Sequence, residues 1–150
     1  MTEHKKYMKL CLKLAGVALR NGDAPVGAVI VFEDQIVGEG IEAGKSRNDI
    51  TCHAEILAIR DAVIKGHAAI LNKAILYTTH EPCLMCSYAI RHHKIPQIVY
   101  GLAVDHIGGH TSDFQVLSTT KVPKWGEAPK VVGGICQDEC KEISNSFNPN

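Results

Sequence analysis

The stretch Cys52-His53-Ala54-Glu55, followed by Glu81-Pro82-Cys83-Leu84-Met85-Cys86, holds the parts of a catalytic zinc site. His53, Cys83 and Cys86 are candidate zinc ligands. Three protein ligands leave one position of a tetrahedral zinc ion open for chemistry, whereas structural zinc sites normally have four. Glu55 is then free to move protons instead of binding metal.

The spacing within the two motifs predicts how they meet. Cys83 and Cys86 are three residues apart, so on a helix they lie on nearly the same face. The positive end of a helix lowers the pKa of a thiol and favours the thiolate that zinc needs. His53 and Glu55 are two residues apart and can share a site only in a first helical turn. We therefore expect two helix N-termini to meet at one metal ion.

A charge count assigns the chemistry to Glu55. Two thiolates balance the charge of zinc, so this metal is a weaker Lewis acid than one held by neutral histidines. A base beside it is then needed, and Glu55 would take a proton from water and return protons to a ring nitrogen and a departing amine. The alternative is a structural zinc site closed by His80, which would have to fold back on its own helix.

Length, charge and cysteine content limit the classes of protein to which the chain can belong. The chain has 150 residues, the size of a single domain, and its 16 Lys and Arg residues equal its 16 Asp and Glu residues. This balance weighs against a broad basic face for nucleic acid. The first ten residues have no apolar segment of a signal peptide, so we expect a cytoplasmic protein without membrane contact. Six cysteines in a reducing compartment favour metal binding by Cys-x-x-Cys over disulfides.

Hydrophobic periodicity predicts an α/β fold with one sheet between helices. We expect a helix capped by Thr51 with Ile56, Ile59 and Val63 buried, and a helix with Pro82 at its first position. The other expected elements are a helix from about Glu3 to Leu19, a hairpin over 28–38, strands at 74–79, 98–100 and 131–132, an irregular segment over 101–130 and a helix over 135–147.

These motifs resemble the cytidine/deoxycytidylate deaminase superfamily, in the branch of tRNA adenosine deaminases, guanine deaminases and fungal cytosine deaminase. The resemblance covers almost the whole chain. Besides the two metal motifs it includes Pro25-Val26-Gly27-Ala28-Val29, Gly38-Glu39-Gly40, Asn48-Asp49, Val99-Tyr100-Gly101 and Gly133-Gly134.

The resemblance implies a three-layer α/β/α fold with a mixed sheet of about five strands, in a homodimer. It also implies one Zn²⁺ per chain on His53, Cys83 and Cys86, with Glu55 as the proton shuttle. The candidate substrate contacts are Glu42, Ala54, Asp105, His106 and His110.

Glu42 departs from the family pattern, which commonly has an asparagine eleven residues before the zinc histidine. An ionised carboxylate accepts hydrogen bonds and cannot donate them, so Glu42 would suit a substrate face rich in N–H groups. A solvated loop residue is the equal alternative. Asp105, His106 and His110 could instead belong to a polar surface loop.

Zero net charge and the uncharged end of the last helix favour a small free heterocycle of the guanine or cytosine type. Deamination of the wobble adenosine of tRNA is the alternative for an enzyme. A catalytically silent zinc module that binds a partner is the alternative outside enzymes, although the presence of Glu55 argues against it.

Overall fold

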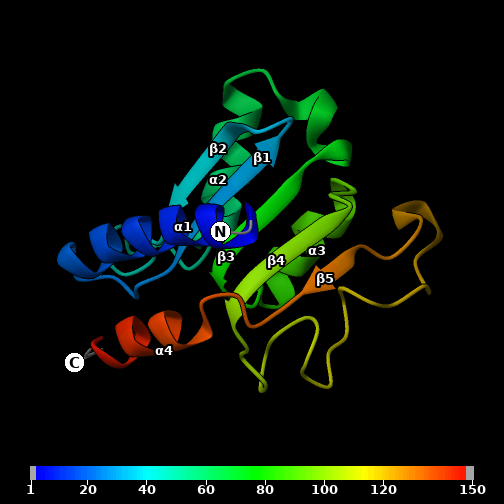
Figure 1. The fold of residues 1–150 in the computed structure, drawn as a ribbon. Helices are drawn as coiled ribbons and strands as arrows, with labels where there is room; N and C mark the ends of the chain where they lie inside the picture. The colour runs from blue at the N-terminus through cyan, green and yellow to red at the C-terminus, as the bar shows by residue number, and fades with distance from the viewer. Residues whose placement is uncertain (1–2, 148–150) are drawn as a thin grey trace.

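A computed structural model describes residues 3–147 and contains one five-stranded sheet in the order β2-β1-β3-β4-β5 (Figure 1). β1 is antiparallel to both β2 and β3, whereas β3, β4 and β5 are parallel to one another. The sheet is therefore mixed, as predicted. The strands are β1 (Gly27–Phe32), β2 (Gln35–Ile41), β3 (Ile75–His80), β4 (Gln97–Leu102) and β5 (Lys130–Val132).

Helices cover both faces of this sheet. α1 (Glu3–Arg20) and α4 (Gln137–Asn145) lie on one face, and α2 (Ala54–Ile64) and α3 (Leu84–His92) on the other (Figure 1). Two short 3-10 helices, η1 (Ala68–Lys73) and η2 (Pro123–Trp125), connect these elements. The predicted three-layer α/β/α architecture is confirmed. Within residues 3–147, no helix is long and apolar enough to cross a membrane.

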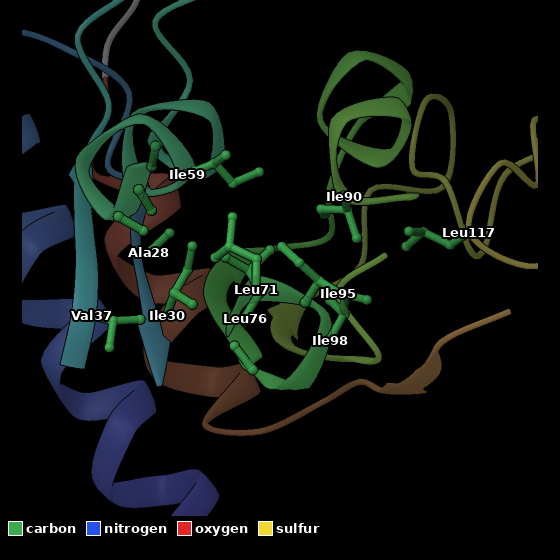
Figure 2. Packing of buried hydrophobic residues seen from close by; sticks show 14 residues of the cluster. Ala28, Ile30, Val37, Ile59, Leu71, Leu76, Ile90, Ile95, Ile98 and Leu117 are labelled. Carbon is green, nitrogen blue, oxygen red and sulfur yellow. The ribbon is translucent and has the colours of Figure 1, made fainter. Parts of the chain in front are cut away.

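The sheet separates two apolar cores because successive strand residues point to opposite faces. On the α2 and α3 side, Ala28, Ile30 and Leu76 pack with Ile90 and Ile98 (Figure 2). On the α1 and α4 side, the buried residues are Tyr7, Met8, Cys11, Val29, Val31, Tyr77, Val99 and Cys140. Both faces of the central strands are therefore buried, which explains their nearly continuous apolar sequences.

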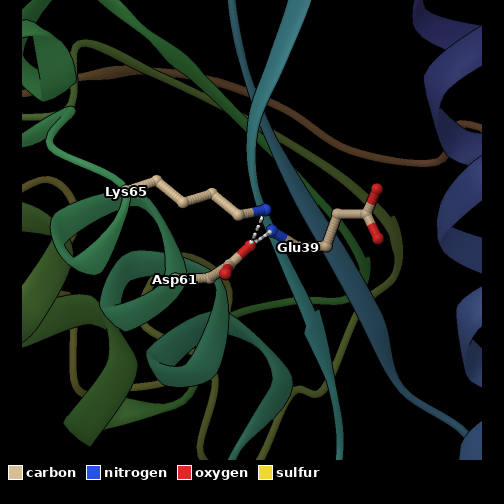
Figure 3. Close-up of polar contacts among 3 residues, drawn as sticks. All are labelled: Glu39, Asp61 and Lys65. Atoms are coloured by element: carbon tan, nitrogen blue, oxygen red, sulfur yellow. Dashed lines mark hydrogen bonds and ion pairs between the residues drawn. The ribbon is translucent and has the colours of Figure 1, made fainter.

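Two features hold α2 close to β2. A β-carbon on Gly40 would lie 1.8 Å from the carbonyl oxygen of Ala54, so only glycine permits this approach. Further along α2, Asp61 Oδ2 accepts hydrogen bonds from the Glu39 backbone N–H at 2.9 Å and from Lys65 Nζ at 3.0 Å (Figure 3). These contacts fix the axis of α2 and with it the position of its N-terminus.

The start and the buried face of α2 differ from the prediction. Thr51 donates to the Asp49 carboxylate through both its backbone N–H and its hydroxyl, so it closes a turn before the helix, and His53 is the N-cap. Ile59 is buried, as predicted, but three alanines form most of the buried stripe and the Val63 side chain is 42% exposed. Small side chains on this face are what allow α2 to approach the glycines of β2. The buried residues are Ala54, Glu55, Ala58, Ile59 and Ala62.

The other helix ends are shorter than predicted. Cys83 is the N-cap of α3, so Pro82 lies before the helix and not at its first position. α4 begins at Gln137, because Cys136 adopts a left-handed backbone conformation with φ of 53°. Residues 101–130 are largely irregular, as predicted, apart from η2.

Candidate active site

His53, Cys83 and Cys86 converge where α2 and α3 begin. His53 Nδ1 lies 3.4 Å from Cys83 Sγ and 3.5 Å from Cys86 Sγ. A zinc ion about 2.3 Å from sulfur and about 2.05 Å from nitrogen separates the two atoms by about 3.6 Å at the tetrahedral angle. The observed distances fit a zinc ion, and the three side chains form a possible zinc site.

The start of α3 favours a thiolate at Cys83, whereas the hydrogen bond with Cys83 and burial raise the pKa of Cys86. Cys83 is the N-cap of α3 and Cys86 lies one turn into the helix, so both face its positive end. The pKa of Cys83 is lowered to about 4, chiefly by a hydrogen bond from Cys86, and the neighbouring His53 acts in the same direction. One thiolate is therefore already favoured before any cation arrives.

Glu55 lies beside these ligands but is not one of the three. It occupies the first turn of α2 and is 3% exposed. Burial raises the pKa of Glu55 to about 8, against the opposing influence of His53. A carboxyl group with a pKa near neutrality can both accept and donate a proton, which is what general acid–base chemistry requires.

A cavity of about 260 Å³ opens onto the site. Glu42 joins His53 and Glu55 in its wall. Glu42 Oε2 accepts the Gly44 backbone N–H at 2.9 Å, and burial raises the pKa of this carboxyl group. The other lining residues are Ala24, Val26, His80, Glu81, Cys83, Val104 and Ile107.

His80 belongs to this wall and not to the metal cluster. Its Nδ1 lies 3.3 Å from Thr79 Oγ1 and its Nε2 lies 3.4 Å from Ser144 Oγ. Burial lowers the pKa of His80 to about 4, so the ring is neutral at pH 7. Among residues 3–147, the cluster with metal-ligand geometry has three members and excludes His80, which leaves the fourth zinc position open.

Glu81 holds the loop that closes the cavity. Its carboxylate accepts hydrogen bonds from the backbone N–H groups of Val104, His110 and Thr111 and from the Thr111 hydroxyl, at 2.6–2.8 Å. Burial alone would raise the pKa of Glu81, but these hydrogen bonds lower it. A β-carbon on Gly108 would meet this carboxylate at 2.1 Å. Glu81 thereby positions Val104 and Ile107, which line the cavity.

The three candidate substrate contacts of the 101–130 segment are not among the residues that line this cavity. Asp105 and His106 are exposed and are not among the residues that line the cavity. His110 Nδ1 lies 3.3 Å from the Tyr100 hydroxyl, also outside the lining. Ala54 is buried in the first turn of α2. Sequence reasoning missed Val104 and Ile107 as lining residues, because nothing in their apolar side chains distinguishes them from core residues.

Comparison with known proteins agrees with this geometry. The family described as "Cytidine and deoxycytidylate deaminase zinc-binding region" matches residues 1–102. The tRNA-specific adenosine deaminase 2 of Xenopus tropicalis is 35% identical, over 100% of this chain and 94% of its own length. A structure solved in a study of A-to-I editing by tRNA:A34 deaminases at the wobble position superimposes with a TM-score of 0.81, at 33% identity, over 92% of this chain and 98% of its own.

A guanine deaminase from Bacillus subtilis is 36% identical with a TM-score of 0.63, but the match covers only 68% of this chain and 66% of that one. The tRNA enzymes thus combine identity above 30% with a match over nearly the full length of both chains. The expectation of a free base of the guanine or cytosine type is wrong. It rested on whole-chain net charge and on the uncharged end of the last helix, and neither describes how charge is distributed over the whole surface.

Proposed function

The chain belongs to the cytidine and deoxycytidylate deaminase family, and within that family we propose that it converts the wobble adenosine of tRNA to inosine. Membership makes it a zinc-dependent hydrolase of C–N bonds other than peptide bonds. The observation that carries the proposed substrate is similarity to tRNA-specific adenosine deaminases over the whole length of both chains.

We assign zinc binding to His53, Cys83 and Cys86, which fit the ion in type and distance. Zinc in this position supplies Lewis-acid activation of water. Glu55 accepts a proton as water adds to C6 of adenine and passes it to N1. It then takes the proton of the new C6 hydroxyl and passes it to the amino group. The C6–N6 bond breaks, ammonia leaves and the carbonyl of inosine remains.

The cavity determines which part of the substrate enters. A volume of about 260 Å³ accommodates one nucleobase, and Glu55 in its wall is 3% exposed. An adenosine therefore reaches Glu55 only after it is unstacked from the RNA, as in other enzymes that act on a base. Glu42 lines the same space and is our first candidate for a substrate contact. Ala54, buried in the first turn of α2, is the second.

A substrate panel tests the proposed function. Zinc-loaded protein is incubated with tRNA carrying adenosine at the wobble position, with the same tRNA carrying guanosine there, and with free guanine, cytosine and adenosine. We expect ammonia release and inosine, read as an adenosine-to-guanosine change in cDNA, only from the first RNA. Turnover of a free base without turnover of tRNA would overturn the proposal.

We further propose that residues 1–150 form one domain, which acts as a cytoplasmic homodimer. Exposed apolar side chains support a partner surface, since Ile64 is 84%, Tyr88 54% and Val63 42% exposed, all on the side of the sheet covered by α2 and α3. Light scattering during gel filtration should give twice the 16.3 kDa chain mass. A monomer at micromolar concentration would contradict the dimer and leave the substrate assignment intact.

A further inference from the structure

A second cavity, of about 370 Å³, lies away from the zinc site. It is lined by Asn72, Arg91, Lys94, Ile95, Trp125 and Glu127, among others. Ile95 lies just before the start of β4 at Gln97, whereas the zinc site lies near the end of this strand, where Leu102 accepts the Glu81 N–H. A six-residue strand spans about 20 Å, so the two cavities open at opposite ends of the sheet.

Arg91 in this wall has an unfilled bonding position. It is 1% exposed, and its Nη1 donates to the carbonyl oxygens of Val116 and Thr119, both at 2.9 Å. Its guanidinium group lies 5.1 Å from the centre of the Trp125 ring. Nη2 has no hydrogen-bond partner in the described part of the chain. A buried cationic donor without an acceptor is unfavourable, so a negative charge placed next to this group would stabilise it.

Lys94 places a second cation at the edge of the same cavity. It follows α3 in the left-handed conformation with φ of 59°, a position that favours glycine. The Lys94 backbone N–H donates to the Arg91 carbonyl oxygen, and the Ile95 N–H donates to the Ile90 carbonyl oxygen. These two hydrogen bonds cap the C-terminal end of α3. Across residues 3–147, no carboxylate lies within ion-pair distance of Lys94. The lining thus carries two cations and one carboxylate, Glu127.

We propose that this cavity binds a phosphate group. A guanidinium held by Trp125 and two carbonyls is oriented before binding and places a fixed positive charge in the wall of the cavity. Lys94 adds a mobile point charge, and the Asn72 amide offers further donors. The volume exceeds that of one ion, which leaves room for the rest of a small phosphorylated molecule or for an exposed phosphate of RNA.

Inorganic phosphate is the probe for this site. Zinc-loaded full-length protein is titrated with phosphate against chloride at constant ionic strength and followed by calorimetry and by thermal unfolding. We expect saturable binding and a rise in melting temperature with phosphate concentration, because a ligand of the folded state stabilises it. Equal melting temperatures in phosphate and chloride, with no heat of binding, would overturn the proposal.

Variants localise the binding. Lys94→Asn keeps a residue that tolerates the left-handed turn and removes the charge, so it should fold and bind phosphate about tenfold more weakly. Lys121→Asn removes the same charge from an exposed loop and should bind as wild type. Arg91→Lys should lose binding further, with circular dichroism as a check on folding. Identical phosphate affinity in Lys94→Asn, Arg91→Lys and wild type would place the anion elsewhere, for example at the zinc ion.

Two sources of phosphate are distinguished by RNA binding. If the group belongs to an RNA backbone, phosphate should compete with tRNA, and Lys94→Asn should weaken tRNA binding more than Lys121→Asn does. If it belongs to a small molecule, both variants should bind tRNA equally well. Either result is consistent with a phosphate site in the second cavity. Neither result depends on which base is deaminated at the zinc site.

Discussion

At the scale of single residues, Glu55 is the side chain on which turnover should depend while metal binding should not. Glu55→Gln keeps the size of the side chain and removes its ability to exchange a proton. We expect the rate of inosine formation to fall about 10²- to 10⁴-fold. Zinc content, measured by atomic emission on dialysed protein, should stay at one ion per chain. Loss of zinc together with activity would instead make Glu55 a metal ligand.

Glu81 should make the stability of the molecule depend on pH. Its pKa in the folded state is lowered from the ordinary value of 4.5. Such a group stabilises the fold fully above its unfolded pKa, and this contribution disappears as the pH falls through the folded pKa. Glu81→Gln should therefore lower the free energy of unfolding by about 2 kcal/mol at pH 7.

The difference between wild type and Glu81→Gln should shrink below pH 4.5. Urea unfolding of both proteins across pH 3–7 measures it. A difference that stays constant over this range would mean that the four hydrogen bonds do not depend on the charge of Glu81.

At the scale of elements, the approach of α2 to β2 sets where His53 and Glu55 lie. A β-carbon at Gly40 would meet the Ala54 carbonyl at 1.8 Å and the Ala58 nitrogen at 2.6 Å. Gly40→Ala should push the start of α2 away and cost about 2 kcal/mol or more, or roughly 4–8 °C in melting temperature. Zinc affinity should fall too, because His53 is the N-cap of this helix.

Gly16→Ala in α1 is the matched control. Its β-carbon would have only the Arg20 side chain nearby, at 3.6 Å, so the helix should gain up to about 1 kcal/mol. Calorimetric melting and zinc titration of the two variants make the comparison. A Gly40→Ala protein that melts and binds zinc like wild type would show that the helix is free to shift.

The same two helices show how far sequence reasoning reaches. His53 and Cys83 were predictable as first-turn residues because ligand spacing allows little else, and both are N-caps. Of the predicted buried stripe of α2, Ile59 is confirmed and Val63 is wrong. The spacing of isoleucines and valine does not reveal that α2 packs on the glycines of β2, against which alanines fit. The cavity wall at Val104 and Ile107 depends on the bonds of Glu81 to a distant loop, which no local pattern encodes.

At the scale of the whole molecule, zinc would join parts of the chain that are distant in sequence. His53 follows the loop after β2, and Cys83 and Cys86 follow β3, so one ion ties the starts of α2 and α3 together. Two apolar cores remain without it. We therefore expect chelated protein to stay folded at 25 °C and to melt at a lower temperature.

The size of this loss follows from linkage between binding and folding. Free zinc at a thousand times its dissociation constant stabilises the folded state by about 4 kcal/mol, equivalent to roughly 8–16 °C in a chain of this length. Calorimetric scans before and after chelation measure the shift. Cys136→Ala, which lies outside the metal cluster, should keep the full shift. Cys83→Ser should melt at the lower, zinc-free temperature both before and after chelation. If chelation lowered its melting temperature as much as that of wild type, the stabilising ion would bind elsewhere.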